Sequence, residues 1–143
     1  MDSLKKILLN PGPVTLTDRV RNSLLQEDLC HREEKFADLL INIKKQLLDV
    51  YNLSEDYDAV VLAGSGTCAV EAMLKSFVNE TDRVLVLSNG VYGERMFSML
   101  EKDKKKVKNQ KEDWLKDTDL DLLDAELNSG NFNKVVCVHN ETT

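Results

Sequence analysis

The sequence predicts an α/β fold in which a mostly parallel sheet is covered by helices. Two observations carry this prediction. Three short apolar runs have the length and composition of buried strands, and segments with helical periodicity separate them; the runs are residues 59–63, 83–88 and 134–139. Strands joined through helices form right-handed crossover units, which produce parallel pairing. A sheet of this kind is buried on both faces, and its strands are therefore apolar without alternation.

The first third of the chain is predicted to form a turn and two helices. Pro11-Gly12-Pro13 is typical of a rigid turn, because the two prolines have fixed φ angles. Thr17 and Asp18 can cap a short helix that carries Val20. A longer amphipathic helix follows, since apolar side chains recur at three- and four-residue steps. They are Phe36, Leu39, Leu40, Ile43, Leu47, Val50 and Tyr51.

The apolar run 59–63 leads into the turn Gly64-Ser65-Gly66-Thr67 and then into a helical pattern. The first N–H groups of such a helix have no partner within it, and the helix dipole is positive there. A phosphate can bind at this position, where glycines allow close approach and the Ser65 and Thr67 hydroxyls add hydrogen bonds. The alternative is that Gly and Ser serve only as turn and cap residues. The spacing matches neither a P-loop nor a dinucleotide-binding turn, so a compact cofactor with one phosphate is favoured.

Apolar runs and helical periodicity also predict the rest of the chain. The polar segment 103–111 includes most of a basic run, 102–108, which is interpreted as a solvated helix end or loop. The elements expected after the turn are, in order, a helix, a strand at 83–88, a helix at 92–101, a weaker helix at 120–127, a loop at 128–133 and a strand at 134–139.

Polar or aromatic side chains follow each of the three predicted strands. These loops are residues 64–67, 89–92 and 139–143. Because ligands of open α/β sheets bind outside the carboxyl ends of the strands, we expect the three loops to converge on one crevice. This convergence strengthens the prediction of a phosphate site.

Length and composition restrict the class of protein. The 143 residues suit one domain by length, and a hydrophobic content of 42% is enough for a globular core. No segment approaches a membrane span or a secretory signal, and the net charge of −6 argues against nucleic acid as a partner. Cys30, Cys68 and Cys137 are scattered, which argues against a disulfide framework and a zinc site. We expect a cytoplasmic protein without a metal and without a membrane or nucleic-acid partner.

Five motifs together resemble the class V aminotransferases, which use pyridoxal 5′-phosphate (PLP) on the fold-type I architecture. They are LNPGPV at 9–14, CHREEKF at 30–36, VLAGSGTCAVEAML at 61–74, VLSNGVYGERM at 86–96 and HNETT at 139–143. The second and third motifs are most similar to the branch of the family that acts on phosphonates. The resemblance implies the amino-terminal part of a PLP-dependent transferase. Residues 1–32 would form an arm and substrate-side segment, and residues 33–143 an incomplete PLP-binding large domain.

The resemblance also implies cofactor contacts. Main-chain N–H groups and hydroxyls of the turn would hold the PLP phosphate; the residues are Ser65, Gly66 and Thr67. Tyr92 would stack on the pyridine ring, whereas the alternative for Tyr92 is an ordinary core aromatic at a helix start. Thr143, or else Thr142, would hydrogen-bond the ring oxygen, and Glu141 would brace that loop.

Further residues have both a substrate-binding and a structural interpretation. Gly12 and Pro13 would belong to a segment that closes over the substrate, or else to a plain rigid turn. His31 and Arg32 could supply positive charge for a substrate phosphonate, or else a structural hydrogen bond. Arg95 is expected to form an internal salt bridge.

The implied reaction moves the amino group of 2-aminoethylphosphonate to pyruvate and gives phosphonoacetaldehyde and alanine. It requires a Schiff-base lysine and a carboxylate at the pyridine nitrogen, which in the family lie beyond the last strand of this chain. We therefore expect a fragment without catalytic residues, and a homodimer for the full-length protein. Three alternatives stay open: an alanine– or serine–glyoxylate-type aminotransferase, a non-catalytic fragment or pseudoenzyme that acts by binding, and a phosphate-dependent nucleotide binder.

Overall fold

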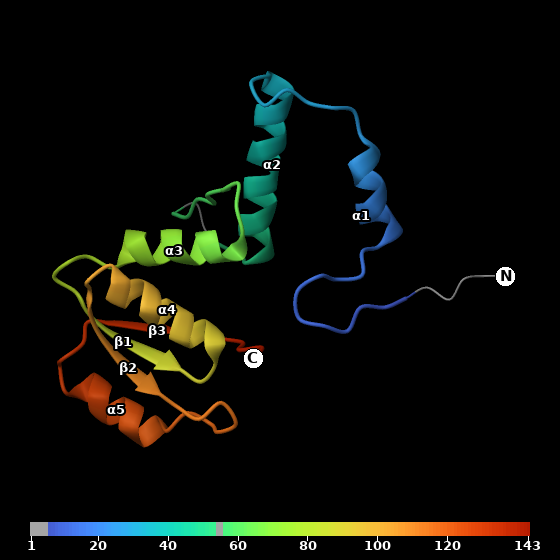
Figure 1. Ribbon diagram of the computed structural model, residues 1–143. Coiled ribbons are helices and arrows are strands. Elements are labelled where there is room, and N and C mark those ends of the chain that lie inside the picture. Colours follow the sequence, from blue (N-terminus) through green and yellow to red (C-terminus); the bar gives the residue numbers. More distant parts are fainter. Residues whose placement is uncertain (1–5, 54–55) are drawn as a thin grey trace. The chain divides into compact units, whose positions relative to one another are not determined.

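A computed structural model describes residues 6–53 and 56–143 (Figure 1). The chain divides into two compact units, one within residues 1–62 and the other at residues 63–143. Within the described ranges, no helix combines the length and the apolarity that crossing a membrane requires.

The unit within residues 1–62 is helical. It contains α1 (Asp18–Asn22), a 3₁₀ turn η1 (Ser23–Leu25) and α2 (Glu34–Val50). Thr17 caps α1 as expected, because its hydroxyl oxygen accepts a hydrogen bond from the N–H of Val20 at 3.4 Å. The amphipathic helix predicted from periodicity is confirmed as α2, although none of its side chains is fully buried in the described unit.

The strand expected at residues 59–63 is absent, and this prediction was wrong. These residues form irregular chain without strand pairing, and the side chains of Val60 and Val61 are 80% and 52% exposed. An apolar run becomes a strand only when a neighbouring strand accepts its backbone hydrogen bonds. The helix predicted after this run is confirmed: α3 (Gly66–Phe77) begins directly at the Gly-Ser-Gly-Thr turn.

The sheet of the second unit has three parallel strands in the order β2-β1-β3. The central strand β1 (Arg83–Ser88) matches the prediction, and β3 (Lys134–Cys137) is two residues shorter than expected. The edge strand β2 (Lys106–Lys111) was not predicted, because its sequence KVKNQK has only one apolar side chain. An edge strand tolerates such a sequence because only one of its sides is paired.

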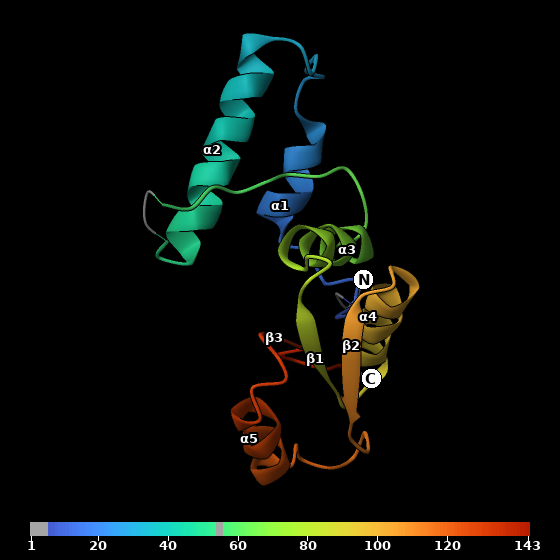
Figure 2. The same cartoon turned by 90° about the vertical axis from the view of Figure 1, so that its left-hand side faces the viewer.

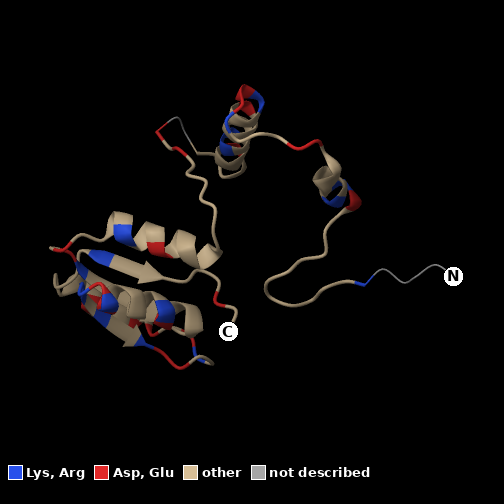
Figure 3. Cartoon of the chain, turned by 45° about the horizontal axis from the view of Figure 1, so that its top comes forward, with Lys and Arg blue, Asp and Glu red and all other residues tan. Residues whose placement is uncertain are grey.

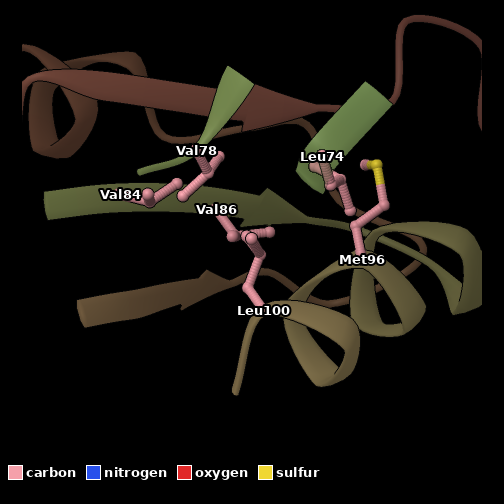
Figure 4. Packing of buried hydrophobic residues seen from close by; sticks show 6 residues of the cluster. All are labelled: Leu74, Val78, Val84, Val86, Met96 and Leu100. Carbon is pink, nitrogen blue, oxygen red and sulfur yellow. The ribbon is translucent and has the colours of Figure 1, made fainter. Parts of the chain in front are cut away.

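Helices cover both faces of this sheet (Figures 1 and 2). The helix α4 (Val91–Lys102) lies on one face, and α5 (Leu120–Asn128) lies on the other. The helix α3 packs on the same face as α4, through a buried cluster that Figure 4 shows; it consists of Leu74, Val78, Val84, Val86, Met96 and Leu100. Leu85 points to the opposite face by strand alternation and is fully buried as well. The predicted α/β class is confirmed.

One glycine allows α4 to pack closely against the central strand. A Cβ atom on Gly93 would lie 2.8 Å from the Cα of Ser88, at the carboxyl end of β1. Gly93 is buried, and any larger residue would push the first turn of α4 away from the sheet. The position of this helix start therefore depends on Gly93.

Lysine and arginine are interspersed with aspartate and glutamate over the described chain, as Figure 3 shows. Ion pairs join neighbouring elements of the second unit. Lys108 of β2 pairs with Glu126 of α5, and Lys111 of β2 pairs with Glu94 of α4 at 2.9 Å. The basic run 102–108 is thus partly a strand, and the interpretation as a solvated helix end or loop was wrong for Lys106 and Lys108.

A buried carboxylate ties the amino ends of β1 and β3 together. Asp82 is 6% exposed and accepts hydrogen bonds from the N–H of Asn79 at 2.7 Å and from the side-chain amide of Asn133 at 2.9 Å. The ammonium group of Lys134 lies 3.1 Å away. The Asn79 hydrogen bond, with support from Lys134 and Asn133, holds the pKa of Asp82 below its usual value.

We predict that Leu100→Ala lowers the free energy of unfolding by about 2–5 kcal/mol, because it opens a cavity in the buried cluster. Leu100 is 2% exposed, whereas Leu115 is 96% exposed. The matched control Leu115→Ala should therefore cost less than about 0.5 kcal/mol. Urea denaturation measures both. Equal losses in the two variants would contradict the assignment of the core.

We also predict that Asp82→Asn flattens the acid limb of the stability profile. The folded pKa of Asp82 lies below the unfolded value. The stabilisation by the carboxylate is therefore complete above the unfolded pKa of about 3.9 and is lost as the pH falls through the folded value. Urea midpoints between about pH 2 and pH 6 test this. The control Asp124→Asn changes an exposed carboxylate of α5 and should keep the steeper wild-type slope.

Candidate functional site

The carboxyl ends of β1 and β3 meet at the first turn of α4. The hydroxyl oxygen of Thr143 accepts a hydrogen bond from the N–H of Val91 at 2.9 Å, and the carboxylate of Glu141 accepts one from the N–H of Gly93 at 3.2 Å. The Thr143 hydroxyl in turn donates to Glu141 at 2.5 Å. Segments about 50 positions apart in the sequence thus form one hydrogen-bonded group.

Glu141 acts as a remote cap of α4. Its negative charge lies at the positive end of the helix dipole, where a carboxylate is favourable. The approach is possible only because Gly90 has no side chain: a Cβ there would collide with Cγ and Cδ of Glu141 and lie 2.6 Å from the Thr143 hydroxyl. The bracing role expected for Glu141 has this structural basis.

The two threonines differ in what they can still donate. The hydrogen of the Thr143 hydroxyl is given to Glu141, whereas Thr142 is exposed and makes no hydrogen bond to a described residue. A contact of either hydroxyl with a cofactor ring oxygen stays a prediction. Thr143 would have to release Glu141 before it could donate.

The start of α3 has main-chain donors without a described partner. Ser65 has extended backbone angles, and its hydroxyl oxygen accepts from the N–H of Cys68 at 3.3 Å. The N–H groups of Gly66 and Thr67 make no hydrogen bond within the described residues. A Cβ at Gly66 would meet no atom within 4 Å, so the space on that side of the helix start is open. Main-chain N–H groups at the start of a twelve-residue helix suit a phosphate.

Arg95 connects the start of α3 to the start of α4. Its guanidinium donates to the Thr67 hydroxyl at 3.4 Å, and the guanidinium carbon lies 5.2 Å from the centre of the Tyr92 ring. The salt bridge expected for Arg95 is absent, because no described carboxylate pairs with it; this expectation was wrong. Tyr92 is 43% exposed, so it is not a core aromatic. Two of the three loops that were expected to converge therefore meet through Arg95.

The four residues expected on the substrate side belong to the other unit. Gly12 has a φ of +112°, which suits glycine in the Pro-Gly-Pro turn. His31 and Arg32 lie in a turn that is closed by a hydrogen bond from the N–H of Glu33 to the carbonyl of Cys30 at 3.1 Å. All four residues, Pro13 included, are exposed. Their role in substrate binding stays a prediction.

A polar contact that was not predicted from the sequence holds the loop after β2. The carboxylate of Glu94 accepts from the indole N–H of Trp114 at 3.1 Å and pairs with Lys111. The hydrogen bond from Lys111, and to a smaller extent the one from Trp114, holds the pKa of Glu94 below its usual value. The spacing along the chain carries no signal for this contact. In the ranges that the structure describes, no group of three or more His, Cys, Asp or Glu residues could hold a metal ion.

The chain is similar in sequence to 2-aminoethylphosphonate–pyruvate transaminases. The chain is 38% identical over 99 residues to a 2-aminoethylphosphonate–pyruvate transaminase of Salmonella paratyphi B, a match that covers 69% of this chain and 27% of that protein. It is 40% identical over 93 residues to the protein of the same name from Lysinibacillus sphaericus, covering 64% and 25%. The chain thus spans about a quarter of the length of these relatives. No protein-family profile matches it.

Solved structures show the same fold. An alanine–glyoxylate aminotransferase from Nostoc superposes with a TM-score of 0.83 at 24% identity, over 99% of this chain and 37% of that one. A pyridoxamine–pyruvate aminotransferase from Mesorhizobium loti gives 0.81 at 23% identity, over 94% and 34%. An aspartate aminotransferase from Thermus thermophilus gives 0.70 at 28% identity, over 76% and 31%. The sheet and its helices therefore have the architecture of PLP-dependent aminotransferases.

We predict that Gly90→Ala releases the segment 139–143 from α4, because the added methyl group occupies the space of the Glu141 side chain. Hydrogen exchange at the amides of Val91 and Gly93 should accelerate about tenfold, since each loses its acceptor. Gly66→Ala is the matched control, because its methyl group would enter open space. Unchanged exchange in Gly90→Ala would contradict the described contact.

Proposed function

The chain is a homologue of the 2-aminoethylphosphonate–pyruvate transaminases and has the fold of class V aminotransferases, and from this premise we propose that it forms the amino-terminal part of such an enzyme. The enzyme transfers the amino group of 2-aminoethylphosphonate to pyruvate, which yields phosphonoacetaldehyde and alanine. The observation that supports the cofactor site best is that the N–H groups of Gly66 and Thr67, at the start of α3, have no hydrogen-bond partner among the described residues.

The chemical groups at the start of α3 are of the types that can bind the phosphate of PLP. The site presents main-chain N–H donors, hydroxyl groups and a cation, which is the donor set that a phosphate ester requires. In the proposal Ser65, Gly66 and Thr67 hold the phosphate. Tyr92 lies against the pyridine ring and excludes water from it. Thr142 or Thr143 contacts the ring oxygen.

PLP, when bound, supplies the electron sink that amino-group transfer requires. The chain itself binds and orients in this proposal. The first turn of α3 fixes the phosphate end, and the exposed face of Tyr92 sets the tilt of the ring. Glu141 keeps the following threonines next to α4. Proton transfer is left to residues that lie outside this chain.

The residues proposed to bind the substrate belong to the unit within residues 1–62. His31 and Arg32 supply positive charge to the phosphonate of the amino donor, since a guanidinium fork suits a tetrahedral dianion. Gly12 and Pro13 belong to the segment that closes over the substrate. Residues 1–32 then form the arm and substrate-side segment, and residues 33–143 form the first part of the PLP-binding domain.

The short coverage of the relatives leads to the remaining parts of the proposal. The chain spans about a quarter of their length, so the lysine and the carboxylate that the reaction needs are assigned to sequence outside it. The complete protein is proposed to be a cytoplasmic homodimer that takes small-molecule substrates. A glyoxylate-type aminotransferase and a non-catalytic binding protein are the alternatives. Turnover of 2-aminoethylphosphonate with pyruvate, against serine or alanine with glyoxylate, separates them in the complete protein.

We predict that the 143-residue chain binds pyridoxamine 5′-phosphate weakly through the start of α3. This form of the cofactor is the suitable probe, because its amine cannot condense with surface lysines. The amide NMR signals of Gly66 and Thr67 should shift on titration, and pyridoxamine without the phosphate should shift them much less. The start of α5 is the internal control, since its cap Asp119 is negative and repels an anion.

Two outcomes would contradict this prediction, and a third would contradict the assignment of the catalytic groups to sequence outside the chain. Equal shifts with pyridoxamine would remove the phosphate from the argument. Shifts with ATP or NAD but not with pyridoxamine 5′-phosphate would favour a nucleotide binder. Formation of alanine from 2-aminoethylphosphonate and pyruvate by this chain alone would show that the catalytic groups lie within it.

A further inference from the structure

Arg95 is an exposed cation of α4 without a described carboxylate partner. Its guanidinium nevertheless has a defined place. It donates to the Thr67 hydroxyl at 3.4 Å and lies over the Tyr92 ring, 5.2 Å from the ring centre. A cation at this distance from an aromatic face is attracted to it, so Tyr92 helps to hold the guanidinium in position.

The chemistry of the Arg95–Thr67 contact determines the direction of the Thr67 hydroxyl. A guanidinium has only donors, so the Thr67 oxygen must act as the acceptor. The single hydrogen of that hydroxyl then remains available for another acceptor. The N–H groups of Gly66 and Thr67 lie in the same first turn and are also unpartnered in the described chain. Three donors are therefore available at the start of α3: the Thr67 hydroxyl, which Arg95 leaves free to donate, and the N–H groups of Gly66 and Thr67.

We propose that Arg95 is a positioning residue that acts through Thr67: it holds the Thr67 hydroxyl as a donor toward the phosphate of the cofactor. This inference rests on the proposed function and adds to it a residue on α4. The guanidinium also covers part of one face of Tyr92, so a flat ring stacks on the other face.

The test is a double-mutant cycle in the full chain, with pyridoxamine 5′-phosphate as the ligand and calorimetry as the measurement. Arg95→Met removes the donors and keeps a long side chain. It should weaken binding about five- to tenfold in the wild-type background and less than about twofold in the Thr67→Val background. Binding of pyridoxamine should change less than about twofold, because it has no phosphate.

Lys102→Met is the matched control. It removes one positive charge from an exposed position in the last turn of the same helix, and it should leave the affinity unchanged. A second measurement does not depend on ligand. The Nη1–H signal of Arg95 in the free protein should move in Thr67→Val, whereas Thr67→Ser keeps the hydroxyl oxygen and should preserve the signal.

The outcomes separate this inference from the proposed function. If the wild-type chain binds pyridoxamine 5′-phosphate and Arg95→Met binds it equally well, the inference is wrong and the proposed function stands. Equal losses from Arg95→Met in both Thr67 backgrounds would show a direct charge contact and would also overturn the positioning role. If the wild-type chain binds no form of the cofactor, both fail together.

Discussion

The arrangement of the candidate site depends on the close packing of the first turn of α4 against the carboxyl end of β1. Gly93 makes this approach possible, because a side chain there would meet the backbone of Ser88. Once the turn is in place, Tyr92 and Arg95 project from it at a defined position. Gly90 opens the same turn on its other side, where the segment that follows β3 binds through Glu141. One helix start therefore joins residues from distant parts of the chain.

The two helix starts in this region differ in how their main-chain donors are used. At α4, the N–H groups of Val91 and Gly93 are satisfied by Thr143 and Glu141, and a carboxylate already lies at the positive end of the helix. At α3, the cap by Ser65 satisfies one N–H group and leaves the first two without a described partner. An added anion would be repelled from the start of α4 and attracted to the start of α3. This difference supports the phosphate position more strongly than the glycine-rich turn alone.

The relatives and the fold agree with this distribution of donors. The identity to 2-aminoethylphosphonate–pyruvate transaminases covers about two thirds of this chain, and the fold is shared with aminotransferases that act on other substrates. Many chemistries use one fold, so the architecture alone leaves the substrate open. The amino donor in our proposal accordingly rests on the sequence relatives, whereas the cofactor position rests on the geometry at α3 and α4.

The sequence by itself determined the helices, the central strand and the turn at the candidate site. Helical hydrogen bonds join residues four apart, so the caps at Thr17 and Ser65 and the periodicity of α2 could be recognised locally. Strand pairing and side-chain contacts join remote segments. For that reason the apolar run 59–63 gained no partner, the charged sequence of β2 became a strand, and Arg95 reached Thr67 instead of a carboxylate. Only the tertiary structure decided these, because each depends on which distant groups lie within hydrogen-bonding distance.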